Sequence, residues 1–116
     1  MNKKYVCIKI MESIDGFDSF SKYIDSDKYI LLFFTASWCG PCKKIYPELE
    51  ELYKKMNTDL IKIYKIQIDN DDNSKICDIF KVQSVPSFFL MKDKKCINTL
   101  NGADIKGIKK MLNIKD

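Results

Sequence analysis

The spacing of apolar positions along the chain predicts five short strands. Residues 5–10 alternate between apolar and polar side chains, which is typical of a strand with one buried face. Residues 29–35 are apolar and β-prone throughout, as expected of a strand that is covered on both faces. Residues 60–68 form the third predicted strand. The last two strands, which we expect to pair antiparallel around a Lys-rich turn, are residues 87–91 and 96–100.

Helical spacing of apolar residues predicts a first helix and a second, much longer one. Asp15 is expected to cap the first helix, whose buried side chains would be Phe17, Phe20 and Ile24. The long helix begins near Cys39 and runs to about residue 56. We expect Pro47 to kink it, because proline has no N–H donor and its ring displaces a carbonyl. The apolar stripe of this helix consists of Ile45, Leu49, Leu52, Tyr53 and Met56.

Two shorter helices are predicted in the second half of the chain. Asn73 or Ser74 is expected to cap the third helix, and Asp104 the fourth. The side chains expected to face the core are Ile76, Ile79 and Phe80 in the third helix, and Ile105, Ile108, Met111 and Leu112 in the fourth.

These elements follow one another in the order β-α-β-α-β-α-β-β-α. Helical connections between the first three strands favour parallel pairing, and the final pair closes as a hairpin. We therefore expect an α/β fold with a mixed central sheet of about five strands flanked by about four helices. Residues 1–116 are expected to form a single domain.

Composition excludes several classes of function. The 116 residues include no His, which removes Ser-His-Asp and Cys-His hydrolases and most catalytic zinc sites. All twenty basic residues are Lys, so the bidentate recognition of phosphate and guanine by Arg is absent, and we expect no nucleic-acid partner. The apolar stretches are too short to span a bilayer, and we expect no membrane partner.

The Trp-Cys-Gly-Pro-Cys motif at residues 38–42 is the strongest chemical signal in the chain. It follows a buried strand and opens a helix, where unpaired N–H groups and the helix dipole favour a thiolate at Cys39. Cys42 lies one turn further on and can reach Cys39 to close a small disulfide ring. Lys43 and Lys44 add positive charge to the same turn. Zinc binding is the alternative, but it needs about four ligands, and the chain has no second Cys-x-x-Cys motif.

The motif resembles the active-site sequence of thioredoxins. Other similarities follow along the chain. Pro47 falls where thioredoxins have a helix-kinking proline, and residues 65–69 resemble their third strand. Residues 85–87 resemble the loop that carries their cis-proline, and Gly102 resembles the glycine before their last helix. The resemblance covers nearly the whole chain and implies the thioredoxin fold.

The resemblance implies a role for each matching residue. Cys39 would be the exposed nucleophile that attacks a substrate disulfide, and Cys42 the buried resolving thiol, the two forming a redox-active disulfide. Lys65 would lie beneath the site and tune the thiol pair; the alternative is a lysine whose stem is buried and whose amine reaches solvent. The residues implied to shape the contact surface and substrate groove are Trp38, Gly40, Pro41, Val85, Pro86 in its cis form, and Gly102.

One departure from the family pattern concerns the resolving thiol. Thioredoxins usually carry a buried aspartate five residues before the active-site tryptophan, where this chain has Phe33. That aspartate would take the proton of the resolving thiol, which a phenyl ring cannot do. Thr35 stands where many relatives have a second tryptophan.

The leading hypothesis is a protein-disulfide reductase of thioredoxin type, which serves electron transport and cell redox homeostasis. It would reduce oxidised protein substrates and take electrons from a reductase of thioredoxin-reductase type, with no cofactor or metal of its own. The alternatives are a disulfide isomerase or oxidase, and a thioredoxin-like binding or scaffold module with weak redox activity. The short segment before Tyr5 predicts a cytoplasmic location, or an organellar one if the chain is processed. The remaining cysteines, expected to be structural, are Cys7, Cys77 and Cys96.

Overall fold

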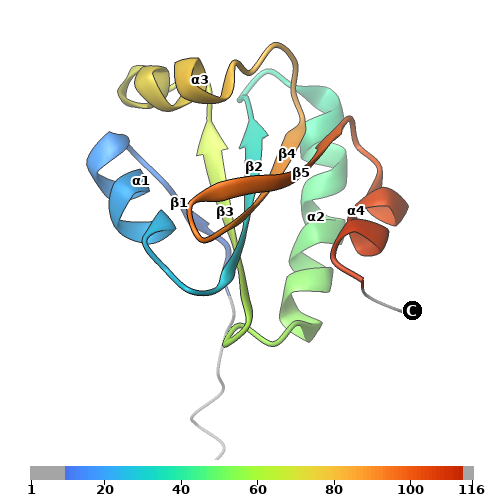
Figure 1. Ribbon diagram of the computed structural model, residues 1–116. Helices are drawn as coiled ribbons and strands as arrows, with labels where there is room; N and C mark the ends of the chain where they lie inside the picture. Colours follow the sequence, from blue (N-terminus) through green and yellow to red (C-terminus); the bar gives the residue numbers. More distant parts are fainter. Residues whose placement is uncertain (1–9, 114–116) are drawn as a thin grey trace, which may run out of the picture.

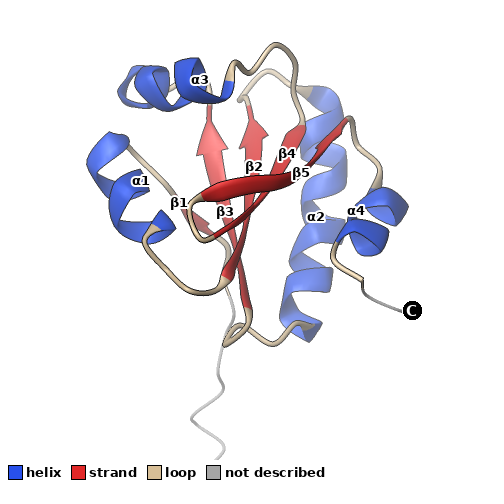
Figure 2. Ribbon diagram, viewed as in Figure 1, coloured by secondary structure: helices blue, strands red, loops and turns tan. Residues whose placement is uncertain are grey.

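A computed structural model describes residues 10–113 of the chain (Figure 1). Within this range a sheet of five strands lies between two pairs of helices (Figure 2). The strands are β1 (Glu12–Ser13), β2 (Tyr29–Thr35), β3 (Ile61–Gln67), β4 (Ser87–Lys92) and β5 (Lys95–Asn101). The helices are α1 (Phe17–Ile24), α2 (Gly40–Lys55), α3 (Ser74–Phe80) and α4 (Ile105–Met111), and a 3₁₀ turn, η1 (Asp71–Asn73), precedes α3.

The sheet has the order β1-β3-β2-β4-β5 and is mixed, as predicted. β3 pairs in parallel with both β1 and β2, because helices connect these strands. β4 runs antiparallel to β2, and β5 antiparallel to β4. Asp93 and Lys94 form the hairpin turn with φ values of 52° and 64°, the positive φ that suits the twist of a two-residue hairpin. The resulting architecture confirms the predicted α/β fold.

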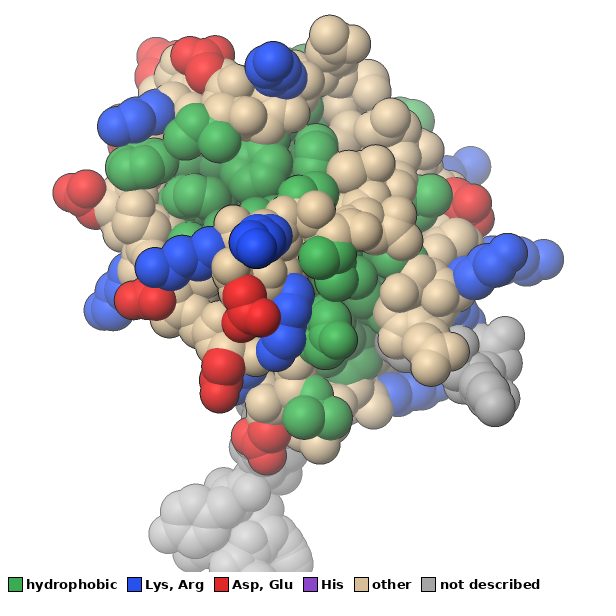
Figure 3. Space-filling view, in the orientation of Figure 1, with side chains coloured by type: hydrophobic (Ala, Val, Ile, Leu, Met, Phe, Trp, Pro, Cys, Tyr) green, Lys and Arg blue, Asp and Glu red, His purple; other side chains and the backbone are tan. Residues whose placement is uncertain are grey.

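Strand β2 supplies side chains to two separate cores. Leu31 and Phe33 face α2 and α4, whereas Leu32 and Phe34 face α1 and α3. Residues 30–34 are each at most 2% exposed, because neighbouring strands and both helical layers cover this strand. The predicted stripe of α2 is buried throughout, which confirms the periodicity that predicted it. Figure 3 shows apolar side chains reaching the surface between α1 and α3, where the partly buried members of the second core include Phe17, Phe80 and Phe89.

Two local predictions are wrong, and a third is correct in position only. Gly16, not Asp15, caps α1: its φ of 96° suits glycine, while the Asp15 carboxylate accepts a hydrogen bond from Asn70 at 3.2 Å. Asn73 is the N-cap residue of α3, as predicted, but its side chain makes no capping hydrogen bond. Ile79, predicted to face the core, is 52% exposed, whereas Ile76 one turn earlier is buried. The predicted strand at residues 5–10 lies outside the described residues except for residue 10, which is not in a strand.

The remaining boundaries agree closely with the prediction. The Asp104 carboxylate caps α4 by accepting a hydrogen bond from the Gly107 N–H at 2.9 Å. Pro47 lies inside α2, and the kink expected there stays a prediction.

Asn73 is a fully buried polar side chain that joins three parts of the fold. Its Oδ1 accepts from the Gly16 N–H at 2.8 Å, and its Nδ2 donates to the Gln67 carbonyl at 2.9 Å. The start of α1 and the end of β3 are thereby tied to η1.

We expect Asn73→Ala to lower the free energy of unfolding by about 2–4 kcal/mol, because it leaves the Gly16 N–H and the Gln67 carbonyl without their partner. Urea denaturation of the two proteins measures this difference. The matched control is Gln83→Ala, which removes an exposed amide and should stay within about 1 kcal/mol of the parent chain. Equal losses in both variants would contradict the role given to Asn73.

Candidate active site

The two motif cysteines lie where β2 ends and α2 begins. Cys39 is the N-cap of α2, with its Sγ accepting a hydrogen bond from the Cys42 N–H at 3.2 Å. The loop is held on its other side by a bond from the Cys39 N–H to the Ala36 carbonyl at 3.2 Å. Pro41 occupies the first turn, where a missing N–H leaves no helical bond unmade. A sulfur at this cap therefore meets the unpaired N–H groups of the helix start.

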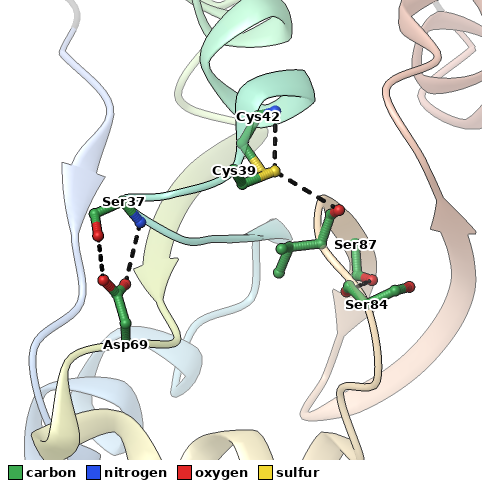
Figure 4. Close-up of a disulfide and its surroundings, with 7 residues drawn as sticks. Ser37, Cys39, Cys42, Asp69, Ser84 and Ser87 are labelled. Atoms are coloured by element: carbon green, nitrogen blue, oxygen red, sulfur yellow. Dashed lines mark hydrogen bonds between the residues drawn. A yellow bond between two sulfur atoms is a disulfide. The ribbon is translucent and has the colours of Figure 1, made fainter.

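Cys39 and Cys42 form a disulfide with their Cα atoms 5.3 Å apart (Figure 4). The predicted exposure of Cys39 is wrong for this oxidised form: it is 4% exposed, and Cys42 is 1% exposed. The Cys39 sulfur is covered because it lies between the start of α2 and the Val85 carbonyl oxygen, which is 3.7 Å away. Trp38 is 68% exposed and provides the apolar surface beside the disulfide.

A second loop faces the disulfide. The peptide bond between Val85 and Pro86 is cis, as expected, and the Val85 carbonyl oxygen lies 3.7 Å from Cys39 Sγ. The Ser87 hydroxyl donates to the Ser84 carbonyl at 2.6 Å and so braces this loop. The Gly102 N–H donates to the Pro86 carbonyl at 2.9 Å. Gly102, which the resemblance assigned to the substrate groove, therefore lies beside the cis-proline loop.

Two hydrogen bonds join Ser37 to Asp69, a pair that no sequence pattern predicted. The Ser37 N–H donates to the Asp69 carboxylate at 3.2 Å, and the Ser37 hydroxyl donates to the same carboxylate (Figure 4). We call this pair the Ser37–Asp69 clamp. It ties the loop before Trp38 to the end of β3. The hydrogen bond from the Ser37 side chain lowers the pKa of Asp69 below its ordinary value. Thirty-two residues separate the pair, so only the pairing of β2 with β3 brings them together.

Comparison with known proteins decides the family. The thioredoxin family model matches residues 13–114. The chain belongs to the thioredoxin family. It is 37% identical over 86 residues to a thioredoxin H-type of Fagopyrum esculentum, covering 74% of this chain and 71% of that one. It is 41% identical over 75 residues to thioredoxin X, chloroplastic, of Arabidopsis thaliana, covering 65% of this chain and 40% of that one.

The fold agrees with solved thioredoxins. The structure of the thioredoxin of Malassezia sympodialis superimposes with a TM-score of 0.84 at 27% identity, covering 94% of each chain. Together with the disulfide between Cys39 and Cys42, this membership makes the protein a thioredoxin-type dithiol–disulfide oxidoreductase, a protein-disulfide reductase.

The surroundings of Cys42 differ from the usual thioredoxin pattern in that Phe33 occupies the acidic position. Phe33 is 0% exposed and belongs to the same apolar cluster as Cys42. Its ring stacks on Phe88 with centroids 5.1 Å apart and on Tyr46 at 6.5 Å. The Lys65 ammonium lies 5.1 Å from the centroid of the Tyr46 ring. Lys65 lines the same surface hollow as Cys42, and its predicted effect on the thiol pair stays a prediction.

A surface hollow of about 280 Å³ lies beside Cys42. We call it the Cys42 hollow. Its walls come from the end of β2, the end of β3 and the first turns of α2, and are formed by residues 35–37, Cys42, Lys43, Tyr46, Pro47, Lys65 and Gln67. Thr35 forms part of the wall, at the position where many thioredoxins carry a bulkier tryptophan.

The other cysteines lie apart from the disulfide. Cys77 is half-buried on α3, and its burial raises the pKa of its thiol. Cys96 is exposed on the edge strand β5. Cys7 lies outside the described residues.

We expect Ser37→Ala to raise the pKa of Asp69 towards its ordinary value, because the hydrogen bonds to the ionised carboxylate are weakened. A depressed pKa adds stability above the ordinary carboxyl pKa, and this contribution is lost as the pH falls through the folded value. The stability gap between the two proteins should therefore be largest at neutral pH and close in acid. Carboxyl NMR titration of Asp69 in the two proteins measures the shift. An unchanged Asp69 titration would refute the clamp.

Proposed function

We propose that Cys39 is the nucleophile of the reductase and that Cys42 is its resolving thiol. The N-cap position of Cys39 supports this, because the N–H of Cys42 points at its sulfur and would stabilise a thiolate there. Cys42 is the more buried of the two and lies one turn further into the helix. A substrate disulfide would therefore meet Cys39 first.

The reaction takes two exchange steps. The Cys39 thiolate attacks one sulfur of the substrate disulfide, and the other substrate sulfur leaves as a thiolate. Cys42 then attacks Cys39 in this mixed disulfide, loses its proton, and releases the second substrate thiol. The Cys39–Cys42 disulfide that results is the form shown in Figure 4.

The substrate would bind around the disulfide, on the surface formed by Trp38, Gly40 and Pro41 and on the loop at Val85 and Pro86. Support comes from the exposure of Trp38 and from the Val85 carbonyl beside the sulfur. Gly102 would border the same groove, since it bonds to the Pro86 carbonyl. Lys65 would act on the thiol pair from the Cys42 hollow.

A thioredoxin-reductase-type enzyme would return electrons to the pair, so that the protein serves electron transport and redox homeostasis. We further propose a cytoplasmic location and a single domain over residues 1–116. Among residues 10–113 no helix is long and apolar enough to cross a membrane. The relatives include a protein named chloroplastic, so location is a question for fractionation of the source cells.

Turnover tests this function. We expect the protein to catalyse the reduction of insulin disulfides by dithiothreitol, and we expect Cys39→Ser to abolish catalysis because no thiol then opens the substrate disulfide. Cys96→Ser changes an exposed cysteine on β5 and is the matched control, which should keep full activity. A chain that binds partners equally well with both motif cysteines replaced, and does not turn over, would be a scaffold module instead.

Cys42→Ser should trap the mixed disulfide. Without a resolving thiol the substrate stays bonded to Cys39, and mass spectrometry of the trapped adducts would also identify the partners. Adducts on Cys77 or Cys96 in place of Cys39 would contradict the assignment.

Phe33→Asp should speed the resolving step, since it adds a base behind Cys42; general-base assistance is typically worth about 10²–10⁴-fold, and we expect the low end because water substitutes in part. The same change should destabilise the fold by several kcal/mol, on the order of the 3–5 kcal/mol known for Phe→Ala in cores. Stopped-flow reduction of a disulfide substrate separates attack from resolution. Phe33→Asn is the control, since it has the same size as Asp and no base. If both variants resolve alike near neutral pH, Phe33 is only a core residue.

A further inference from the structure

We propose that the Cys42 hollow binds a carboxylate, and that this carboxylate accepts the Cys42 proton when Cys42 resolves the mixed disulfide. The inference rests on the proposed roles of Cys39 and Cys42. It adds a ligand site and a preference for substrates that carry an acidic side chain beside their disulfide.

Cys42 needs a proton acceptor that its apolar surroundings do not offer. It is 1% exposed and shares its cluster with Phe33 and Phe88. Burial among apolar side chains disfavours a thiolate, so attack by Cys42 requires that its proton be removed. The chain has no His, the side chain that most often performs this task near neutral pH. Cys42 lines the Cys42 hollow, so an acceptor from outside can approach it there.

The walls of the hollow fit an anion. Lys43 of α2 and Lys65 of β3 both line it, so two cationic residues border it from different elements. Thr35 is a buried polar side chain on its wall and adds a hydroxyl. None of the described residues that line the hollow is acidic. Cationic and hydroxyl donors around a small cavity are the groups that bind carboxylate oxygens.

Two carboxylates interact with residues that line the hollow, and both are already engaged. Asp69 accepts both hydrogen bonds of the Ser37–Asp69 clamp. Glu50 lies beside the Tyr46 hydroxyl, and together with burial it raises the pKa of Tyr46. Among residues 10–113, Lys65 forms no ion pair, and its ammonium lies over the Tyr46 ring, so no described carboxylate neutralises its charge.

The proton transfer and bond changes balance as follows. The Cys42 S–H proton passes to a carboxylate oxygen, and the freed electron pair on Cys42 Sγ forms the bond to Cys39 Sγ. The bond between Cys39 and the substrate sulfur breaks, and its electron pair leaves on that sulfur. The carboxylic acid then returns its proton to the departing thiolate or to water, so the carboxylate is regenerated.

Two sources supply this chemistry: an Asp or Glu side chain of the substrate, or a free small carboxylate. Single-turnover experiments distinguish them, with reduced full-length protein and two peptide disulfides that differ only by Glu or Gln beside the cysteine. With the Gln peptide, resolution should rise to a plateau as acetate replaces chloride at constant pH and ionic strength. With the Glu peptide, resolution should be fast and independent of acetate.

We expect a gain of roughly tenfold at the plateau, below the 10²–10⁴-fold of a fixed general base because the ligand is only partly positioned. Methanesulfonate has the same charge but is a far weaker base, so it should compete with acetate without accelerating the step. The initial attack by Cys39 should not respond to either anion.

Variants locate the effect. Lys65→Met should abolish the acetate plateau, and Lys65→Arg should retain it because the charge is kept. Lys43→Met, at an exposed position, should weaken acetate binding even if Lys65→Met folds poorly. Lys54→Met removes one exposed charge at the other end of α2 and is the matched control, which should leave the plateau unchanged.

The outcomes separate the two proposals. If Cys42→Ser releases the substrate as fast as the parent chain, Cys42 is not the resolving thiol and the proposed function is wrong. If Cys42→Ser traps the substrate but resolution in the parent chain ignores acetate and the Glu side chain, only the carboxylate site is wrong. A linear response to acetate that survives Lys65→Met is bulk buffer catalysis and also overturns the site.

Discussion

The two-sided pairing of strand β2 is the constraint on which the site depends. β3 bonds to one edge of β2 and β4 to the other, so two loops far apart in the chain meet at its carboxyl end. The loop to Cys39 leaves β2 there, and β4 begins there at Ser87, directly after the cis-proline. Because residues 30–34 are almost fully buried, neither pairing can slip by one residue without exposing apolar side chains. The distance between Cys39 and Val85 is therefore set by the core.

The different surroundings of Cys39 and Cys42 follow from the position of α2, which begins at the end of β2. The start of α2 lies at the end of β2 and presents its unpaired N–H groups to Cys39. Cys42, one turn on, falls into the apolar layer between sheet and helix. One thiol is thus favoured as an anion while the other is not, which is the asymmetry that sequential thiol exchange requires.

Phe33, at the position where thioredoxins usually carry an aspartate, adds to the stability of the core but cannot accept a proton from Cys42. Phe33 stacks between Phe88 and Tyr46 and contributes apolar burial that a carboxylate would forgo. Phe33 pairs with Lys65 across the two strands, and among residues 10–113 Lys65 forms no ion pair. A cationic hollow beside a buried thiol is the consequence, and it gives the substrate or solvent a part in the proton transfer.

The local pattern of the chain determined much of this protein. The strand at residues 29–35, the long helix with its buried stripe, the hairpin and the Asp104 cap all follow from residues close in sequence, where periodicity and capping act. The motif at residues 38–42 and its position between strand and helix followed in the same way.

Tertiary structure alone decided the contacts between distant residues. Asn73 tying Gly16 to Gln67, the Ser37–Asp69 clamp and the covering of Cys39 by the Val85 loop each join segments that only the sheet brings together. The Cys42 hollow belongs with them, because its walls come from two strands and a helix, and no local pattern records the space between them.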